Sequence, residues 1–303
     1  MMYKRLGRTE VSIPEIGLGT WNYHGGPIPL RRGLEAGALF IDTAEAYQVE
    51  PVIREAMTGM RERLFLATKV SPQNFRRADL HKSVETSLRR LGTDHLDLLQ
   101  LHRPNPAIPI EETIGAMSEL VDVGKTRFIG VCNFSLAELQ AAQKALGSRR
   151  IVSNQVRYSV IDRTIENGLL SYCQTEGITV IAYSPLARSF DRILDCDPTG
   201  VIKDLAARLG KSPAQIVLNW CLCKDGVVII PKGNSEAHVV DNCGASDWRL
   251  SAEQVGLLVS RIQYRHRTAF DAFARRFLTR GPLRVFALKA VKLLPRGVRR
   301  RLE

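Results

Sequence analysis

The sequence predicts an α/β protein of the (β/α)8 TIM-barrel class, in which eight parallel strands each lead into a helix. Two observations support this fold. Eight short, apolar, β-branched runs recur along residues 1–260, and longer stretches with helical periodicity lie between them. Strands that are apolar on both faces are typical of a parallel sheet covered by helices, and eight repeats suffice to close such a sheet. A doubly wound open sheet is the competing architecture.

The predicted elements follow one another in a regular order. The strand candidates are 15–21, 39–43, 64–70, 96–102, 127–134, 152–158, 179–186 and 227–231. Among the helices, 79–92 carries apolar side chains at spacings of three and four, and 212–222 begins with a serine cap followed by proline. The opening segment, 2–17, has turn residues at its centre and is predicted to form a β-hairpin that caps the barrel floor.

The positive charge of the chain is concentrated near its end. The sequence holds 43 basic and 31 acidic residues, a formal net charge of +12. Residues 261–303 contain 13 of the basic and 2 of the acidic residues, so residues 1–260 are almost neutral. We therefore predict a barrel domain over 1–260 and a basic helical extension, an amphipathic tail, over 261–303.

Signals for targeting, disulfides and metals are weak. The first residues lack the apolar segment of a secretory signal, and no apolar run reaches the ~18 residues of a membrane span, so a cytoplasmic location is expected. Six cysteines are too sparse for a disulfide framework, and the C-x-C of Cys221 and Cys223 lacks a second pair for zinc. No metal is predicted.

A polar or aromatic residue stands where each predicted strand ends, which is the rim that carries the active site in barrels. In chain order these residues are Thr20, Trp21, Asp42, Tyr47, Lys69, His102, Asn133, Gln155, Tyr183, Ser184 and Lys232. Each has an ordinary explanation by itself, since an aspartate after a strand is more often a helix cap and a histidine after an apolar run is more often a core residue. Their recurrence after every strand indicates an active site.

Several motifs of the chain resemble those of the aldo-keto reductase superfamily, over residues 2–255. They are RLGRTEVSIPEIGLGTW (5–21), FIDTAEAY (40–47), LATKV (66–70), LLQLHRPNP (98–106), NQVRYS (154–159), AYSPLA (182–187) and IPKGNSEAHVVDN (230–242). The resemblance implies a catalytic tetrad of Asp42, Tyr47, Lys69 and His102. It also implies an oxidoreductase that transfers a hydride between a nicotinamide dinucleotide and an aldehyde, a ketone, a sugar or the corresponding alcohol.

The chemistry of carbonyl reduction explains these four residue types. Negative charge develops on the carbonyl oxygen and needs a proton donor, for which Tyr47 is the candidate general acid/base. A free phenol has a pKa near ~10, and the Lys69 ammonium is expected to lower that pKa. Asp42 is expected to act as the buried counter-ion of Lys69, and His102 to donate to the carbonyl oxygen or orient it.

The resemblance further implies the cofactor contacts, with NADP(H) preferred and NAD(H) as the alternative. At the nicotinamide end, Gly19 and Thr20 are expected near the ribose, Asn133 and Gln155 at the carboxamide, and Tyr183 on the ring. Ser184 and Leu186 are expected at the pyrophosphate. At the other end, Lys232, Gly233 and Asn234 are expected at the 2′-phosphate, and Asn242 at the adenine. His238 stands where many relatives have arginine, and Cys132 where they have serine. Trp21 and Tyr23 are expected to form an apolar wall of the substrate pocket.

Readings from other classes stay open at this point. The chain could bind the cofactor as a redox-sensing regulatory subunit with little turnover. The tail places Phe270, Phe273 and Phe277 on one side of a predicted helix and arginines opposite, before a break at Gly281. It could pack on the barrel and cover the pocket, or bind an anionic membrane surface and make the protein peripheral there. A nucleic-acid partner is disfavoured, because no base-reading module accompanies the charge.

Overall fold

The computed structural model describes residues 1–264, so the predicted tail lies, from residue 265 onward, outside the described residues. Residues Met1–Gln263 form one compact unit. Its strands are β1 (Tyr3–Arg5), β2 (Ser12–Pro14), β3 (Leu18–Gly19), β4 (Phe40–Asp42), β5 (Phe65–Val70), β6 (Leu96–Leu101), β7 (Thr126–Cys132), β8 (Ile151–Arg157), β9 (Thr179–Tyr183) and β10 (Val227–Ile230). Its α-helices are α1 (Pro27–Glu35), α2 (Glu50–Ala56), α3 (Arg77–Leu91), α4 (Ile110–Asp122), α5 (Leu136–Leu146), α6 (Leu169–Glu176), α7 (Asp191–Leu194), α8 (Val201–Leu209), α9 (Pro213–Leu222), α10 (Glu236–Cys243) and α11 (Ala252–Arg261). Short 3-10 helices are η1 (Glu45–Tyr47), η2 (Arg61–Arg63), η3 (Pro72–Asn74) and η4 (Thr164–Glu166).

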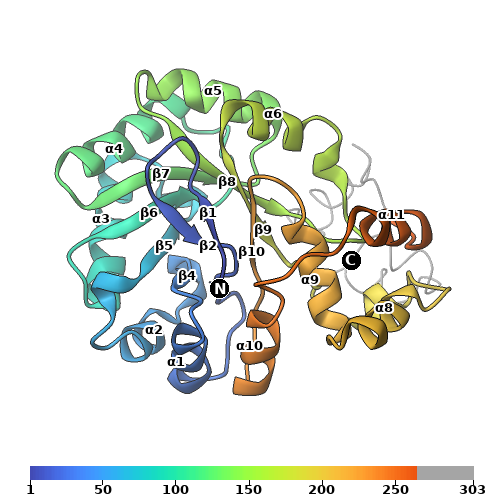
Figure 1. Ribbon diagram of the computed structural model, residues 1–303. Coiled ribbons are helices and arrows are strands. Elements are labelled where there is room, and N and C mark those ends of the chain that lie inside the picture. The colour runs from blue at the N-terminus through green and yellow to red at the C-terminus, as the bar shows by residue number, and fades with distance from the viewer. Residues whose placement is uncertain (265–303) are drawn as a thin grey trace, which may run out of the picture. The chain divides into compact units, whose positions relative to one another are not determined.

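The eight strands β3 to β10 form the predicted barrel. They pair side by side in chain order, and every pair is parallel. The segment before β3 closes the ring, because Ile16 bridges Ile229 of β10 and the Gly17 amide donates to the Ile229 carbonyl at 2.8 Å. Figure 1 shows the helices arranged around the outside of the strands. The fold class predicted from the sequence is confirmed, and the open doubly wound sheet is excluded.

Two of the predicted strands that end early do so at a residue with a left-handed backbone. Strand β7 stops at Cys132 and β9 at Tyr183, whereas the sequence pattern continued to residues 134 and 186. The next residue in each case, Asn133 or Ser184, takes a left-handed backbone conformation with φ of 62° or 52°. Such a residue cannot continue an extended strand. The chain therefore turns at the rim sooner than the apolar pattern indicates.

The predicted serine cap of α9 is present, and other helices are capped as well. Helix α9 begins with a capping box in which Ser212 accepts from the Gln215 backbone amide, and α3 ends at Gly92 with φ 67°. Helices α5 and α11 also begin with capping boxes, at Ser135 and Ser251. Across residues 1–264, no helix is long and apolar enough to cross a bilayer.

The N-terminal hairpin of β1 and β2 covers the floor of the barrel, as predicted. Leu6 and Ile13 are fully buried and share an apolar cluster with residues of the barrel strands. The Gly7 amide donates to Thr179 Oγ1, at the start of β9, at 2.7 Å. Gly7 has φ +56°, and a Cβ there would lie 3.0 Å from the Val152 carbonyl oxygen, so this turn requires glycine.

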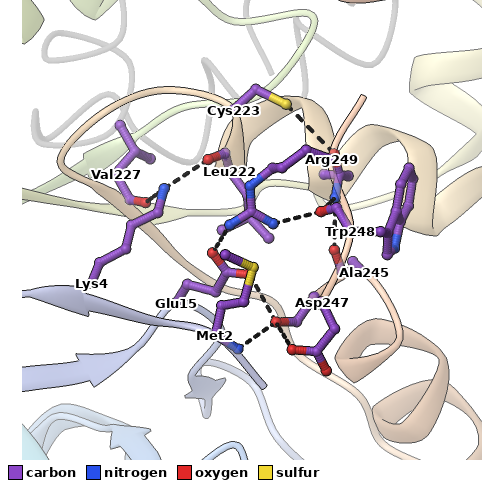
Figure 2. A network of polar contacts seen from close by, with 12 residues as sticks. Met2, Lys4, Glu15, Leu222, Cys223, Val227, Ala245, Asp247, Trp248 and Arg249 are labelled. Atoms are coloured by element: carbon purple, nitrogen blue, oxygen red, sulfur yellow. Dashed lines mark hydrogen bonds and ion pairs between the residues drawn. The ribbon is translucent and has the colours of Figure 1, made fainter. Parts of the chain in front are cut away.

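A polar network ties this hairpin to the final part of the barrel domain (Figure 2). Glu15 is fully buried, forms an ion pair with Arg249 and accepts from Ser246 Oγ at 2.7 Å. Lys4 Nζ donates to the backbone carbonyls of Leu222, Lys224 and Val227 at 2.7, 3.1 and 2.8 Å. Burial lowers the pKa of Lys4 to about 8, although the nearby Glu15 raises it. The hairpin is therefore held on the barrel by polar and charged contacts as well as by apolar ones.

Alternation along the strands places a polar layer above an apolar one inside the barrel. The apolar cluster contains Phe40, Ala67 and Leu98. Two residues further along each of β4, β5 and β6 stand the buried polar groups Asp42, Lys69 and Gln100. Successive residues of a strand point to opposite faces, so residues two apart share the barrel interior. This spacing delivers polar side chains to the carboxyl end of the barrel.

Candidate active site

The structure brings the predicted tetrad together at this end of the barrel. Lys69 Nζ donates to Asp42 Oδ2 at 2.5 Å and to the Thr43 carbonyl at 2.8 Å, and Lys69 and Asp42 are both buried. Tyr47 follows on η1, with Lys69 Nζ 5.1 Å from the centre of its ring. Tyr47 Oη lies 3.3 Å from His102 Nε2. A phenol, an imidazole and a buried ion pair therefore meet in one place.

Burial dominates the protonation of these groups. It works against the charge of Lys69, but Asp42 outweighs it and the pKa of Lys69 is raised. Burial raises the pKa of Tyr47 to about 12, against the lowering effect of Lys69. Lys69 thus acts on the pKa of this phenol in the expected direction, and burial outweighs it in the protein without ligands. Burial, with Lys69 and Arg103, lowers the pKa of His102 to about 3, so its imidazole is neutral.

The second oxygen of Asp42 binds two glutamines. Gln155 Nε2 donates to Asp42 Oδ1 at 2.7 Å, and Gln100 Nε2 donates to the same oxygen at 3.2 Å. The sequence prediction placed Gln155 at the cofactor carboxamide and omitted Gln100. A signal for Gln100 did exist, because it is a polar residue in an apolar strand, two positions before His102 and on the same strand face.

Asn133 and Tyr183 form a second contact pair at the rim. Tyr183 Oη donates to Asn133 Oδ1 at 2.8 Å, and Asn133 Nδ2 donates to the His102 carbonyl at 3.2 Å. Asn133 is thus joined to the segment that carries the histidine. Cys132 is buried beside it, and burial raises the pKa of this thiol to about 12. The thiol is therefore protonated and can offer only weak hydrogen bonds.

The loop between β10 and α10 presents exposed polar groups. Lys232 and Asn234 are exposed, and Lys232 Nζ donates to the Asn22 carbonyl at 3.0 Å. Ser235 caps α10 by accepting from the backbone amide of His238 at 3.3 Å. Gly233 is packed so tightly that a Cβ would meet Val239 at 2.6 Å. An exposed ammonium beside the amino end of a helix suits a phosphate group.

Three residues on the first rim segment are closely packed. Tyr23 is only 4% exposed and donates to the Gly26 carbonyl at 2.7 Å, so its ring belongs to the core and does not line an open pocket. Thr20 is fully buried and donates to the Asp42 carbonyl at 2.9 Å. A Cβ on Gly19 would lie 2.5 Å from the Ile230 carbonyl oxygen. Gly19 and Thr20 are therefore both packed within the wall of the barrel.

Trp21 retains the exposure that a pocket wall needs. Its side chain is 49% exposed, and the Arg188 guanidinium lies 4.9 Å from the centre of its ring. Arg188 belongs to the loop after β9, in which Ser184 opens the turn and Leu186 packs on the core. The loops after β3 and β9 thus meet across the rim, a contact that the sequence does not reveal. Asn242 is 6% exposed on α10.

Metal-binding groups do not gather in this part of the chain. Among residues 1–264, no three His, Cys, Asp or Glu side chains lie close enough to hold a metal ion. The rim carries a proton donor, Tyr47, a neutral imidazole, His102, and the buried Lys69–Asp42 ion pair, with further hydrogen-bonding side chains around them.

This barrel with its tetrad defines the chain as a carbonyl-reducing enzyme of the barrel type. It belongs to the aldo/keto reductase family, whose model matches residues 15–262. Methylglyoxal reductase YeaE of Escherichia coli strain K12 is 38% identical over 260 residues, which cover 82% of this chain and 91% of that protein.

Two solved structures extend the comparison. An aldo-keto reductase from Klebsiella pneumoniae in complex with NADPH has a TM-score of 0.81 at 36% identity, covering 88% of this chain and 98% of that one. The thermostable aldo-keto reductase Tm1743, in complex with the inhibitor epalrestat, has a TM-score of 0.80 at 40% identity, covering 86% and 99%. The family predicted from the sequence motifs is confirmed.

Proposed function

We propose that this protein is an NADPH-dependent reductase of small aldehydes and ketones, and that 2-oxoaldehydes such as methylglyoxal are among its substrates. The observation that carries the proposal is the contact of Tyr47 with His102 beside the buried Lys69–Asp42 pair. The NADPH-bound and methylglyoxal-reducing relatives support the choice of cofactor and substrate.

The tetrad provides a proton at the carbonyl oxygen. A nicotinamide cofactor, when bound, supplies the hydride. Tyr47 stays protonated in the free protein because burial raises its pKa to about 12, so the proton is present when a carbonyl arrives. After the proton leaves, the Lys69 ammonium stabilises the phenolate, which then regains a proton from solvent. His102 is neutral and positions the carbonyl oxygen beside Tyr47.

The rim has groups suited to a dinucleotide phosphate. Lys232 is the exposed cation at the β10–α10 loop, and the amino end of α10 lies beside it, so we assign the 2′-phosphate to this loop. Asn133, Gln155 and Tyr183 are assigned to the nicotinamide end, Ser184 and Leu186 to the pyrophosphate, and His238 and Asn242 to the adenosine end. Gly19 and Thr20 are left with backbone contacts only.

The test is a turnover assay of the purified protein with methylglyoxal and other short aldehydes, using NADPH and NADH in parallel. We expect NADPH to be consumed with the aldehyde, to bind more tightly than NADH, and the alcohol to be the product. Tight NADPH binding without turnover of any carbonyl in the panel would favour the redox-sensing alternative instead.

We also propose that the basic tail attaches this reductase to anionic membrane surfaces. The tail holds 13 basic and 2 acidic residues, and its first predicted helix has a phenylalanine side opposite an arginine side. Basic residues near an anionic surface contribute about 1 kcal/mol each, so such a segment could bind without any change in the barrel.

A further inference from the structure

We propose that Gln100, which lies outside the tetrad, is a positioning residue that fixes both the Asp42–Lys69 pair and the amide orientation of Gln155. The inference rests on the proposed function, because it assigns Gln100 a role in proton donation and in cofactor binding. It concerns a side chain that touches neither substrate nor cofactor and acts through its two neighbours.

Gln100, Gln155 and Asp42 form a closed triangle of hydrogen bonds inside the barrel. Gln100 is fully buried near the end of β6 and donates from Nε2 to Asp42 Oδ1 at 3.2 Å. Gln155, on β8, donates from Nε2 to the same oxygen at 2.7 Å and to Gln100 Oε1 at 3.2 Å. Three strands, β4, β6 and β8, thus each contribute one corner. The fourth group, Lys69, binds the other oxygen of Asp42.

The triangle determines which way each amide points. An ionised carboxylate only accepts hydrogen bonds, so both glutamines must turn their nitrogen toward Asp42. The second hydrogen of the Gln155 amide is taken by Gln100 Oε1. Gln155 Oε1 is left with one weak neighbour, Cys132 Sγ at 3.9 Å. Gln155 therefore presents an acceptor, and the –NH2 of a nicotinamide carboxamide is a matching donor.

The same contacts bear on the proton donor. Two donors on Oδ1 hold the Asp42 carboxylate in one orientation and keep Oδ2 on Lys69. Without Gln100, part of the carboxylate charge loses its partner in a buried setting, where unsatisfied polar groups are costly. The charge of Asp42 also raises the pKa of Tyr47. If Gln100 no longer donates to Asp42, the Asp42 charge is less well stabilised by hydrogen bonds, and the pKa of Tyr47 should rise further.

The test replaces Gln100 with methionine, which keeps the length of the side chain and removes both hydrogen-bonding groups. We expect kcat to fall about tenfold, as for a lost hydrogen bond to a charged group, with the KM for the aldehyde nearly unchanged. The Kd for NADPH, measured by fluorescence without substrate, should rise severalfold. Leu99→Met is the control, because Leu99 is equally buried on the same strand but outside the triangle, and it should leave both values unchanged.

Two further variants make the result decisive. Gln100→Leu also removes both hydrogen-bonding groups, with a different apolar shape, and should change kcat and Kd in the same direction, which covers a failure of the methionine variant to fold. In Gln100→Met/Gln155→Met, the Kd should be no worse than in Gln155→Met alone, because Gln100 acts on the cofactor through Gln155.

A purely structural role gives a different pattern. If Gln100→Met lowers resistance to urea but keeps the wild-type kcat and Kd, or if the Kd effects of the two positions multiply, the proposal is overturned. A wild-type protein that binds NADPH but reduces no carbonyl would instead contradict the proposed function, and the Kd measurements would still decide the role of Gln100.

Discussion

Burial and a neighbouring cation act in opposite directions on the pKa of the Tyr47 phenol. Burial is the stronger influence and raises its pKa to about 12, while Lys69, 5.1 Å from the ring centre, acts to lower it. The lysine therefore does not prepare a phenolate in the free protein. Its charge matters after proton transfer, when it stabilises the negative phenolate.

Tyr47→Phe removes this proton donor with little change of shape. We expect kcat to fall by about 10²–10⁴, the usual contribution of a general acid, while the Kd for NADPH stays nearly constant. Tyr23→Phe is the matched control, because Tyr23 is buried in the core and its hydroxyl donates to the Gly26 carbonyl, away from the tetrad. Steady-state kinetics with an aldehyde measure both. Full activity in Tyr47→Phe would show that another group donates the proton.

The pH profile separates the influence of burial from that of Lys69. Reduction needs a protonated Tyr47 and, in our mechanism, a neutral His102, whose pKa values are about 12 and about 3. Because His102 loses its proton below the working range and Tyr47 above it, kcat/KM for reduction should be flat from about pH 5 to about pH 10. If kcat/KM instead falls on the alkaline side with a midpoint near pH ~9, Lys69 lowers the pKa of Tyr47 more than burial raises it. If kcat/KM falls on the acid side with a midpoint near pH ~6.5, His102 has the pKa of a histidine in water.

At the scale of elements, the sequence predicts the order of strands and helices well and their ends less well. Apolar runs locate all eight barrel strands, but the left-handed residues Asn133 and Ser184 end two of them early. Asparagine is only enriched in that conformation and serine is not, so the residue type alone does not place the end of the strand. The tetrad could be predicted because its motifs resemble those of the family. The direction of the Gln155 amide could not, because it depends on Gln100 from another strand, and the burial of Tyr23 depends on packing against the core.

The hairpin should be secured mainly by its buried ion pair. Glu15→Gln leaves Arg249, whose side chain is 29% exposed, without its charged partner, and we expect the free energy of unfolding to fall by about 2 kcal/mol, as for a lost hydrogen bond between charged groups. Glu10→Gln, on the same hairpin, removes a pair whose side chains are 57% and 93% exposed, and should have a far smaller effect. Urea denaturation measures both. Equal losses of unfolding free energy in the two variants would mean that the burial of Glu15 does not strengthen its ion pair. We expect kcat to be unchanged in both variants.

The β10–α10 loop should determine the choice between cofactors. Lys232→Ala is expected to weaken NADPH binding about 10- to 100-fold, the range for a hydrogen bond between charged groups, and NADH binding far less, because only NADPH carries the 2′-phosphate. Lys203→Ala, an exposed lysine on α8, is the control. Fluorescence titration with each dinucleotide provides the measurement, and equal losses for both would place Lys232 away from the phosphate. His238→Arg should strengthen NADPH binding, since arginine can bind phosphate with two hydrogen bonds.

For the whole molecule, the barrel assigns stability and chemistry to opposite ends. The hairpin, its apolar plug and the Glu15–Arg249 pair lie at the floor, whereas the tetrad and the Lys232 loop lie at the rim. Substitutions at the floor should therefore change unfolding without changing turnover. Such separation is general for this barrel class, in which loops at the carboxyl ends of the strands carry the chemistry.

Membrane attachment by the tail makes a prediction about location rather than rate. The full-length protein should co-sediment with vesicles containing phosphatidylserine at low salt and much less with neutral phosphatidylcholine vesicles. At about 1 M salt, where the Debye length falls to about 3 Å, it should be released. Deletion of residues 264–303 should leave the protein in the supernatant with its kcat intact. If full-length protein fails to sediment with anionic vesicles, and the deletion instead changes the KM for the aldehyde, the tail acts on the substrate site and the membrane proposal is wrong.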